Sequence, residues 1–273
     1  MSRQIFAYIL HKDGVVDDTA YELVSAARKI DPNASTVALV GGPGPEIDDV
    51  CKELAQVYNE VWKIDHESLS YILADIIRPM LVNVIPKESL VLIAHEHFGM
   101  DLAPGLSIKL ESSFVSDVVD FDVMGNGDLK VIREEFSGQV RTHVQCRISD
   151  GAVISIRAGA FKPAEASGEA GNIIDRTEDA IKSGVPDVPR KFLEILEAEV
   201  GEVDITKSEI LISVGRGIED QDNLEIAFDL AEAVGGDVSC SRPIVDAKWL
   251  EKGRQVGTSG KTVKPKVYMR SEE

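Results

Sequence analysis

The chain has 273 residues and a formal net charge of −18, and 44% of its residues are hydrophobic. A protein of this length has room for about two domains, each with a buried core. Its acidic balance argues against general binding to nucleic acid or to anionic membranes, because like charges repel. No stretch approaches the roughly 18 consecutive apolar residues that would span a bilayer, so membrane insertion is not expected.

Three cysteines, Cys51, Cys146 and Cys240, are odd in number and widely spaced. They form neither a CxxC pair nor a zinc-binding pattern, so neither a disulfide scaffold nor a metal site is predicted. The first residues lack the apolar region and the cleavage site of a signal peptide. These features together predict a cytoplasmic protein, because thiols stay reduced in that compartment.

The first part of the chain alternates short apolar runs with amphipathic stretches. The predicted strands are residues 4–10, 35–40, 60–64 and 89–94. The predicted helices are residues 17–30, 46–57 and 68–84, the last of them bent at Pro79. Alternation at this spacing is typical of βαβ units and predicts a parallel sheet with right-handed crossovers.

The pattern becomes rich in strands after about Asp120. Asn126-Gly127-Asp128 has the composition of a hairpin turn. The strand-like segments that follow are residues 129–136, 140–148 and 152–156. The polar residues 163–171 are predicted to form a loop, and residues 190–200 a helix of mixed charge. We place a domain boundary at about Thr206, which gives domains of residues 1–206 and 207–273.

The second domain starts with a new strand and turn. Its predicted elements are a strand at 209–214, an amphipathic helix at 221–234, a short strand at 237–239 and a strand-like segment at 266–269. Gly235-Gly236 ends the helix, as glycines at helix C-termini do. One strand–helix–strand unit with a loop is small for a doubly wound domain, so this domain is predicted to be incomplete.

Two motifs of the first domain are weak. Gly41-Gly42-Pro43-Gly44 lies between a strand and a helix, where a phosphate could bind, but it is neither a GxGxxG motif nor a P-loop. A plain turn is therefore favoured, and a nucleotide-binding enzyme that uses this turn remains an alternative. His95-Glu96-His97 could bind a metal, but in a strand the acid would point away from the histidines, so a polar strand end is favoured.

Three segments of the second domain combine glycines, hydroxyls and cations. Gly215-Arg216-Gly217 follows the first strand, and Ser241-Arg242-Pro243 follows the second. Residues 255–262 form a third such segment. Residues 242–270 contain eight Lys or Arg and two acids, which suits either an anionic ligand or a solvated basic face. Because ligands bind at the carboxyl ends of parallel strands, these segments favour a nucleotide or dinucleotide ligand.

The ordered segments SVGRGI, CSRPIVDAKWL and RQVGTSGKTVKPKVY resemble the FAD domain of the electron-transfer flavoprotein α subunit. In the first domain, MDLAPGLSIKLESSFVSDV and ISIRAGAFKP resemble further segments of the same family. The resemblance covers nearly the whole chain. It implies an N-terminal parallel-sheet α/β domain with a strand-rich extension, followed by a doubly wound FAD-binding domain that is truncated here.

The resemblance also implies which residues bind FAD. Arg216 would contact the FAD, Ser241 and Arg242 would follow, and Arg242 would lie near the isoalloxazine ring. Val256, Gly257, Thr258 and Ser259 would form the loop along the flavin. The family usually has Gln-Thr where this chain has Thr258-Ser259. Ser259 keeps the hydroxyl that the family places near the flavin N5.

The implied function is that of an electron carrier. The chain would pair with an electron-transfer flavoprotein β subunit as a heterodimer, accept electrons from flavin dehydrogenases, and pass them to a quinone reductase or another acceptor. Family members continue beyond the segment at 266–269 with parts that hold the pyrophosphate, the adenosine and the flavin edge. The alternative is therefore a structural subunit that binds the β subunit but no FAD.

Overall fold

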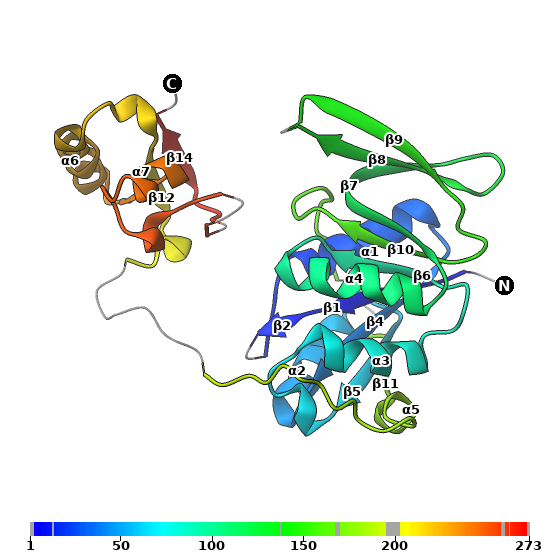
Figure 1. Ribbon diagram of the computed structural model, residues 1–273. Coiled ribbons are helices and arrows are strands. Elements are labelled where there is room, and N and C mark those ends of the chain that lie inside the picture. The colour runs from blue at the N-terminus through cyan, green and yellow to red at the C-terminus, as the bar shows by residue number, and fades with distance from the viewer. Residues whose placement is uncertain are drawn as a thin grey trace. The chain divides into compact units, whose positions relative to one another are not determined.

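The computed structural model describes residues 3–12, 14–136, 138–166, 170–194, 203–257, 260–261 and 263–271. The chain forms two compact units, Met1–Phe192 and Leu193–Glu273 (Figure 1). Both units are built from strands and helices that alternate along the chain, in agreement with the predicted α/β class.

A single nine-stranded sheet forms the centre of the first unit (Figure 1). In spatial order its strands are β11 (Asn172–Asp175), β5 (Glu60–Asp65), β4 (Ser35–Gly42), β1 (Gln4–Ile9), β6 (Leu90–Ala94), β10 (Ala152–Ile156), β7 (Ser113–Val123), β8 (Leu129–Glu135) and β9 (Val140–Cys146). The pairs from β11 to β7 are parallel, and β7, β8 and β9 pair antiparallel. Two short strands, β2 (His11–Lys12) and β3 (Val15–Val16), pair separately.

Helices cover both faces of this sheet, and each face has its own apolar core. The helices are α1 (Thr19–Ile30), α2 (Pro45–Leu54), α3 (Ala74–Val84), α4 (His97–Lys109) and α5 (Thr177–Ala180). Helices α1 and α2 pack with one core, and α3, α4 and α5 with the other. This is the three-layer arrangement that parallel sheets require, because both of their faces are apolar.

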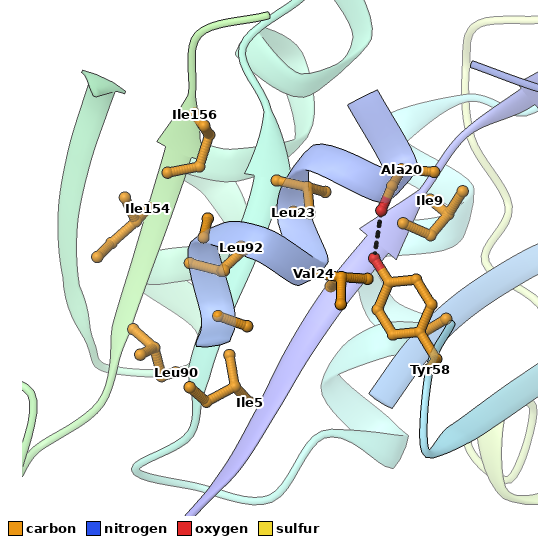
Figure 2. Packing of buried hydrophobic residues seen from close by; sticks show 14 of the residues in the cluster. Ile5, Ile9, Ala20, Leu23, Val24, Tyr58, Leu90, Leu92, Ile154 and Ile156 are labelled. Carbon is orange, nitrogen blue, oxygen red and sulfur yellow. Dashed lines mark hydrogen bonds between the residues drawn. The ribbon is translucent and has the colours of Figure 1, made fainter. Parts of the chain in front are cut away.

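Figure 2 shows the core under α1. Leu23 and Val24 of this helix lie near Ile9 of β1, while Ile5 of the same strand lies beside Leu90, and all of these side chains are almost fully buried. The Tyr58 hydroxyl donates a hydrogen bond of 2.7 Å to the carbonyl oxygen of Ala20. Strand β1 contributes to both cores, because its odd-numbered residues pack into this one and its even-numbered residues, Phe6 and Tyr8, into the core on the opposite face.

The predicted helix over residues 68–84 is wrong in its first part. Glu67–Leu69 forms a separate turn of 3₁₀-helix, and α3 begins only at Ala74. Leu69 and Ala74 are both buried in the core. In one continuous helix, residues five apart would point about 140° away from each other, so the chain must break between them.

Helix α4 was not predicted, because Gly99, Pro104 and Gly105 obscure its periodicity. Its buried residues Leu102 and Leu106 nevertheless face the core at helical spacing. Gly99 lies against the end of β6, where an added Cβ atom would be 1.9 Å from the carbonyl oxygen of Ala94. The glycine is therefore required by close packing between helix and strand.

The helix predicted over residues 190–200 is not present in its described part. Residues 190–194 have no regular structure, and residues 195–200 lie outside the described residues. Arg190 instead forms ion pairs with Asp75 and Asp101, and Phe192 stacks on Tyr71 with ring centroids 4.1 Å apart. These tertiary contacts outweigh the weak helical preference of a short segment. Strand β11, just before this region, was not predicted.

The second unit has a three-stranded parallel sheet in the order β13 (Asp237–Cys240), β12 (Ile210–Val214), β14 (Val267–Arg270). Helix α6 (Leu224–Val234) packs on β12 and β13 through Leu224, Ala227 and Ala231. Gly235 ends α6 in the left-handed conformation, as predicted. A short helix, α7 (Arg242–Asp246), follows β13. The predicted strands of this unit are thus confirmed. Its predicted helix begins only at Leu224, after a 3₁₀ turn at Gln221–Asn223, and α7 was not predicted.

Candidate functional site

A pocket of about 380 Å³ opens at the carboxyl ends of the second unit's strands. The residues that line it come from the ends of β12 and β14 and from the segments that follow all three strands: Ser213, Val214, Gly215, Arg216, Ser241, Pro243, Arg270 and Ser271. Parallel α/β sheets bind their ligands at this edge, because the loops that follow the strands converge there. The position of the pocket is therefore that of a ligand site.

Backbone hydrogen bonds beyond the strand ends build the pocket. The Ser241 N–H donates to the Val214 carbonyl oxygen at 3.0 Å, and the Ser271 N–H donates to the Ser213 carbonyl oxygen at 3.0 Å. The Gly215 N–H lies 3.4 Å from the Ser271 hydroxyl oxygen, which accepts from it. These contacts place the two serines on either side of Gly215.

Because Gly215 has no side chain, the space beside its backbone in the pocket stays open. An added Cβ atom would lie 3.1 Å from the Ser271 carbonyl oxygen and 3.7 Å from the Ser241 hydroxyl oxygen. Both of these residues line the pocket. A glycine here therefore lets a ligand approach the backbone.

The lining combines apolar surface with hydroxyl and positively charged groups. It has two guanidinium groups, Arg216 and Arg270, and three hydroxyls, and none of the eight lining residues is acidic. Guanidinium groups pair with phosphate through two parallel N–H donors, and hydroxyls add further hydrogen bonds. The donor set therefore fits the diphosphate of a dinucleotide such as FAD.

The structure brings together two of the residues singled out from the sequence. Arg216 and Ser241 both line the pocket. Arg242 lies next to Ser241 but on α7, where its side chain is 68% exposed and forms an ion pair of 3.4 Å with Asp246. Arg242 therefore follows a lining residue in the chain but is not itself part of the lining.

The loop with Val256 and Gly257 is attached to the end of β13. The Val256 N–H donates to the Cys240 carbonyl oxygen at 2.9 Å, and Gly257 has a φ of 124°, a conformation that favours glycine. Thr258 and Ser259 lie outside the described residues. The described part of the loop thus starts directly beside Ser241.

Cys240 precedes Ser241 but is not a reactive thiol. Its side chain is fully buried. Burial raises the pKa of the thiol to about 11, although the nearby Arg254 acts in the opposite direction. The thiol is therefore protonated at neutral pH and packs as a small apolar group.

Sequence reasoning missed Ser213, Arg270 and Ser271. Arg270 and Ser271 follow a segment that was recognised only as the start of a strand. Their place in the pocket depends on the pairing of β14 with β12, in which Arg270 lies beside Ser213. A signal existed in Arg270, a cation at the end of an apolar run, but only the pairing shows which strand it joins.

The first unit holds a separate polar cluster at the carboxyl ends of β6 and β10. The His95 Nδ1 atom lies 2.9 Å from the Ser155 hydroxyl oxygen. Arg157 binds both carboxylate oxygens of Asp117 at 2.8 Å. Asp117 lies at a bulge in β7 with a φ of 56°, an unusual conformation for a residue with a side chain.

The charges in this cluster are held in fixed states. Hydrogen bonding from Arg157 holds the pKa of Asp117 below its usual range. Burial lowers the pKa of His95, although the Asp117 carboxylate acts in the opposite direction. Within the described residues, no group of three His, Cys, Asp or Glu side chains could hold a metal ion.

In the glycine turn of the first unit, a carboxylate of the protein already accepts the N–H that a phosphate would use. Gly41 and Gly42 belong to β4 rather than to the turn. The N–H of Gly44, at the start of α2, donates to the Asp65 carboxylate at 2.9 Å. A phosphate there would meet that carboxylate, which favours the plain turn.

Fold and site together define a two-part α/β protein, whose second part offers a dinucleotide-type pocket. The family model of the electron transfer flavoprotein domain matches residues 5–181. The model of the electron transfer flavoprotein FAD-binding domain matches residues 204–271. The chain belongs to the electron transfer flavoprotein family, and its relatives include α subunits.

Three relatives show the range of this similarity. Protein FixB of Clostridium saccharobutylicum is 27% identical over 97% of this chain and 79% of its own length. The acryloyl-CoA reductase electron transfer subunit beta of Anaerotignum propionicum is 28% identical over 98% of this chain and 81% of its own. The electron transfer flavoprotein subunit alpha of Thermoanaerobacterium thermosaccharolyticum is 28% identical, with the same two coverages.

Among the described residues, no helix has both the length and the apolar character needed to cross a membrane.

Proposed function

We propose that this chain is an electron-transfer flavoprotein α subunit that binds one FAD in the pocket of its second unit. It carries electrons from flavin dehydrogenases to a quinone reductase or another acceptor in the cytoplasm, and is not itself an enzyme. The observation that carries the proposal is the pocket at the carboxyl ends of β12, β13 and β14. Arg216 and Ser241, the residues that match the family's FAD contacts, both line it.

The residues of the site have distinct roles. Arg216 binds the diphosphate, and Gly215 lets it approach the backbone. Ser241 and Arg242 lie toward the flavin, with Arg242 providing a permanent positive charge near the ring. Arg242 can leave its partner Asp246 at little cost, because exposed ion pairs contribute only about 0–1 kcal/mol. Bound FAD supplies the one-electron chemistry.

The segment after β13 completes the proposed site. Val256, Gly257, Thr258 and Ser259 form the loop along the flavin. The bond between the Val256 N–H and the Cys240 carbonyl oxygen holds the start of this loop beside Ser241. The Ser259 hydroxyl supplies the hydrogen bond near the flavin N5 that the family's threonine would make.

We further propose that the chain works as a heterodimer with an electron-transfer flavoprotein β subunit. Residues 1–206 form the domain that packs with the β subunit, and residues 207–273 form the FAD domain. The large core and the nine-stranded sheet of the first unit support a role as the assembly scaffold. The relatives that are named electron transfer subunits support the same assignment.

The alternative function is that of a structural subunit that binds the β subunit but no FAD. The small core of the second unit favours it, because the apolar cluster among that unit's described residues is much smaller than either cluster of the first unit. A nucleotide-binding enzyme that uses the Gly41 turn is less well supported, since Asp65 occupies the Gly44 N–H.

Visible absorption spectra test the proposal. The chain is purified together with its presumptive β subunit, and a flavin spectrum at about one FAD per α chain is expected. Arg216→Ala should lose the flavin, because it removes a guanidinium from the pocket, while the heterodimer stays intact. Arg147→Ala, at an exposed arginine of the first unit, is the matched control and should retain it. A colourless but stable heterodimer of the unaltered chain would favour the structural subunit instead.

A further inference from the structure

Strand β14 brings a second arginine to the pocket. In the parallel pairing of β14 with β12, Arg270 lies beside Ser213. The next residue, Ser271, donates its N–H to the Ser213 carbonyl oxygen at 3.0 Å and accepts from the Gly215 N–H at 3.4 Å. The end of β14 is thereby fixed to the end of β12, and both Arg270 and Ser271 line the pocket.

Arg216 reaches the same pocket from the neighbouring strand. It directly follows Gly215 and begins the short 3₁₀ turn Arg216–Ile218. The two guanidinium groups therefore come from the ends of two adjacent strands, β12 and β14, and the Ser213, Ser241 and Ser271 hydroxyls lie in the lining with them. This is a donor-rich pocket with two separate permanent positive charges.

We infer that Arg216 and Arg270 form a two-arginine clamp for the diphosphate of a dinucleotide. A diphosphate has two adjacent anionic groups, and each can accept a pair of N–H donors from one planar guanidinium. A carboxylate has a single charge and only two oxygen atoms, whereas a diphosphate offers a separate anionic group to each arginine. The volume of about 380 Å³ suits a part of a ligand of this class.

The inference rests on the proposed function, because FAD is the dinucleotide expected here. It goes beyond that function by assigning Arg270, at a position that neither the sequence motifs nor the family resemblance single out. It also assigns the two parts of the ligand to different residues. The diphosphate depends on Arg270, whereas the flavin ring lies toward Arg242 and the loop at Val256.

Ligand titrations of the heterodimer stripped of flavin test the clamp. The probes are FAD, ADP and riboflavin, of which only the first two have a diphosphate. Arg270→Ala should weaken binding of FAD and ADP by about 10–100-fold, the range expected for lost hydrogen bonds to a charged group. Riboflavin binding should not change. Arg270→Lys should restore part of the affinity, because it keeps the charge but not the planar pair of donors.

Lys266→Ala is the matched control. Lys266 precedes the same strand at its amino end, is exposed and pairs with Glu209. Its replacement should leave all three affinities unchanged. The melting temperature of each variant shows whether it is folded, and Arg270→Gln, which keeps much of the side chain, replaces Arg270→Ala if the latter unfolds.

The outcomes separate the clamp from the proposed function. If the unaltered protein binds FAD and Arg270→Ala or Arg270→Gln binds it equally well, the clamp is wrong and the proposed function stands. An equal loss of riboflavin and FAD also overturns the clamp, because the effect is then not on the diphosphate. If the unaltered protein binds ADP but no FAD, and Arg270→Ala loses ADP, the clamp holds and the proposed function fails. If the unaltered protein binds neither FAD nor ADP, both the clamp and the proposed function are wrong.

Discussion

In the proposed site, Arg242 is the residue whose charge acts on the bound flavin. Its guanidinium is always protonated and exposed, and the residue directly follows Ser241, which lines the pocket. We expect Arg242→Ala to lower the one-electron reduction potential of the bound flavin. A loss of about 1.4 kcal/mol of stabilisation for the reduced, more negative form corresponds to about 60 mV. A reductive titration followed by absorption spectroscopy measures this shift.

Arg242→Lys is the control for this prediction, since it keeps a positive charge and should preserve most of the potential. The surface pair with Asp246 is lost in the alanine variant, but such exposed pairs contribute little to stability. A titration of Arg242→Ala that overlays that of the unaltered protein would contradict a role for this residue near the flavin ring.

The sequence predicted those site residues that lie in recognisable turns. Gly215, Arg216 and Ser241 come soon after predicted strands, so their place at the strand ends could be inferred from local pattern alone. Arg270 and Ser271 could not be found in this way, because their place depends on a pairing between strands some 55 residues apart in the chain. Local signals identify the end of a strand, whereas long-range pairing decides which ends share a pocket.

Among the elements, α4 was missed although it is one of the longest helices described. Gly99, Pro104 and Gly105 lower its intrinsic helical preference. Packing decides in favour of the helix, because Leu102 and Leu106 are completely buried. Strand β10 shows the reverse: its apolar run marked it as a strand, but only the structure shows it parallel between β6 and β7.

Gly99 provides a test of this packing argument. A methyl group at Gly99 would overlap the Ala94 carbonyl oxygen, at 1.9 Å, so α4 would have to move away from β6. We expect Gly99→Ala to reduce the free energy of unfolding by about 3 kcal/mol or more, since backbone cannot yield as a flexible side chain can. Urea denaturation measures the difference.

The control for this variant is Gly125→Ala. Gly125 has no heavy atom within 4 Å of an added Cβ atom, so the same change should have little effect there. If Gly99→Ala were as stable as Gly125→Ala, the close approach of α4 to β6 would not be a constraint on the fold.

For the whole molecule, the two units differ sharply in the core that each contains. The first unit has two extensive apolar cores, one on each face of its sheet, whereas the second has a single small one. Burial of apolar surface is the main stabilising term in folding, and domains of about 60 residues bury too little of it to be more than marginally stable. The first unit should therefore fold by itself.

Expression of residues 1–206 alone tests whether the first unit folds without the second. We expect a single cooperative unfolding transition with a midpoint close to that of the main transition of the full chain, because both cores of the first unit are retained. The fragment should bind the β subunit, as the proposed scaffold, but should bind no flavin, since it lacks the pocket with Arg216, Ser241 and Arg270. Circular dichroism, co-purification and an absorption spectrum measure these three properties. If the fragment were unfolded, the second unit would be part of the scaffold, and the proposed boundary near Thr206 would be wrong.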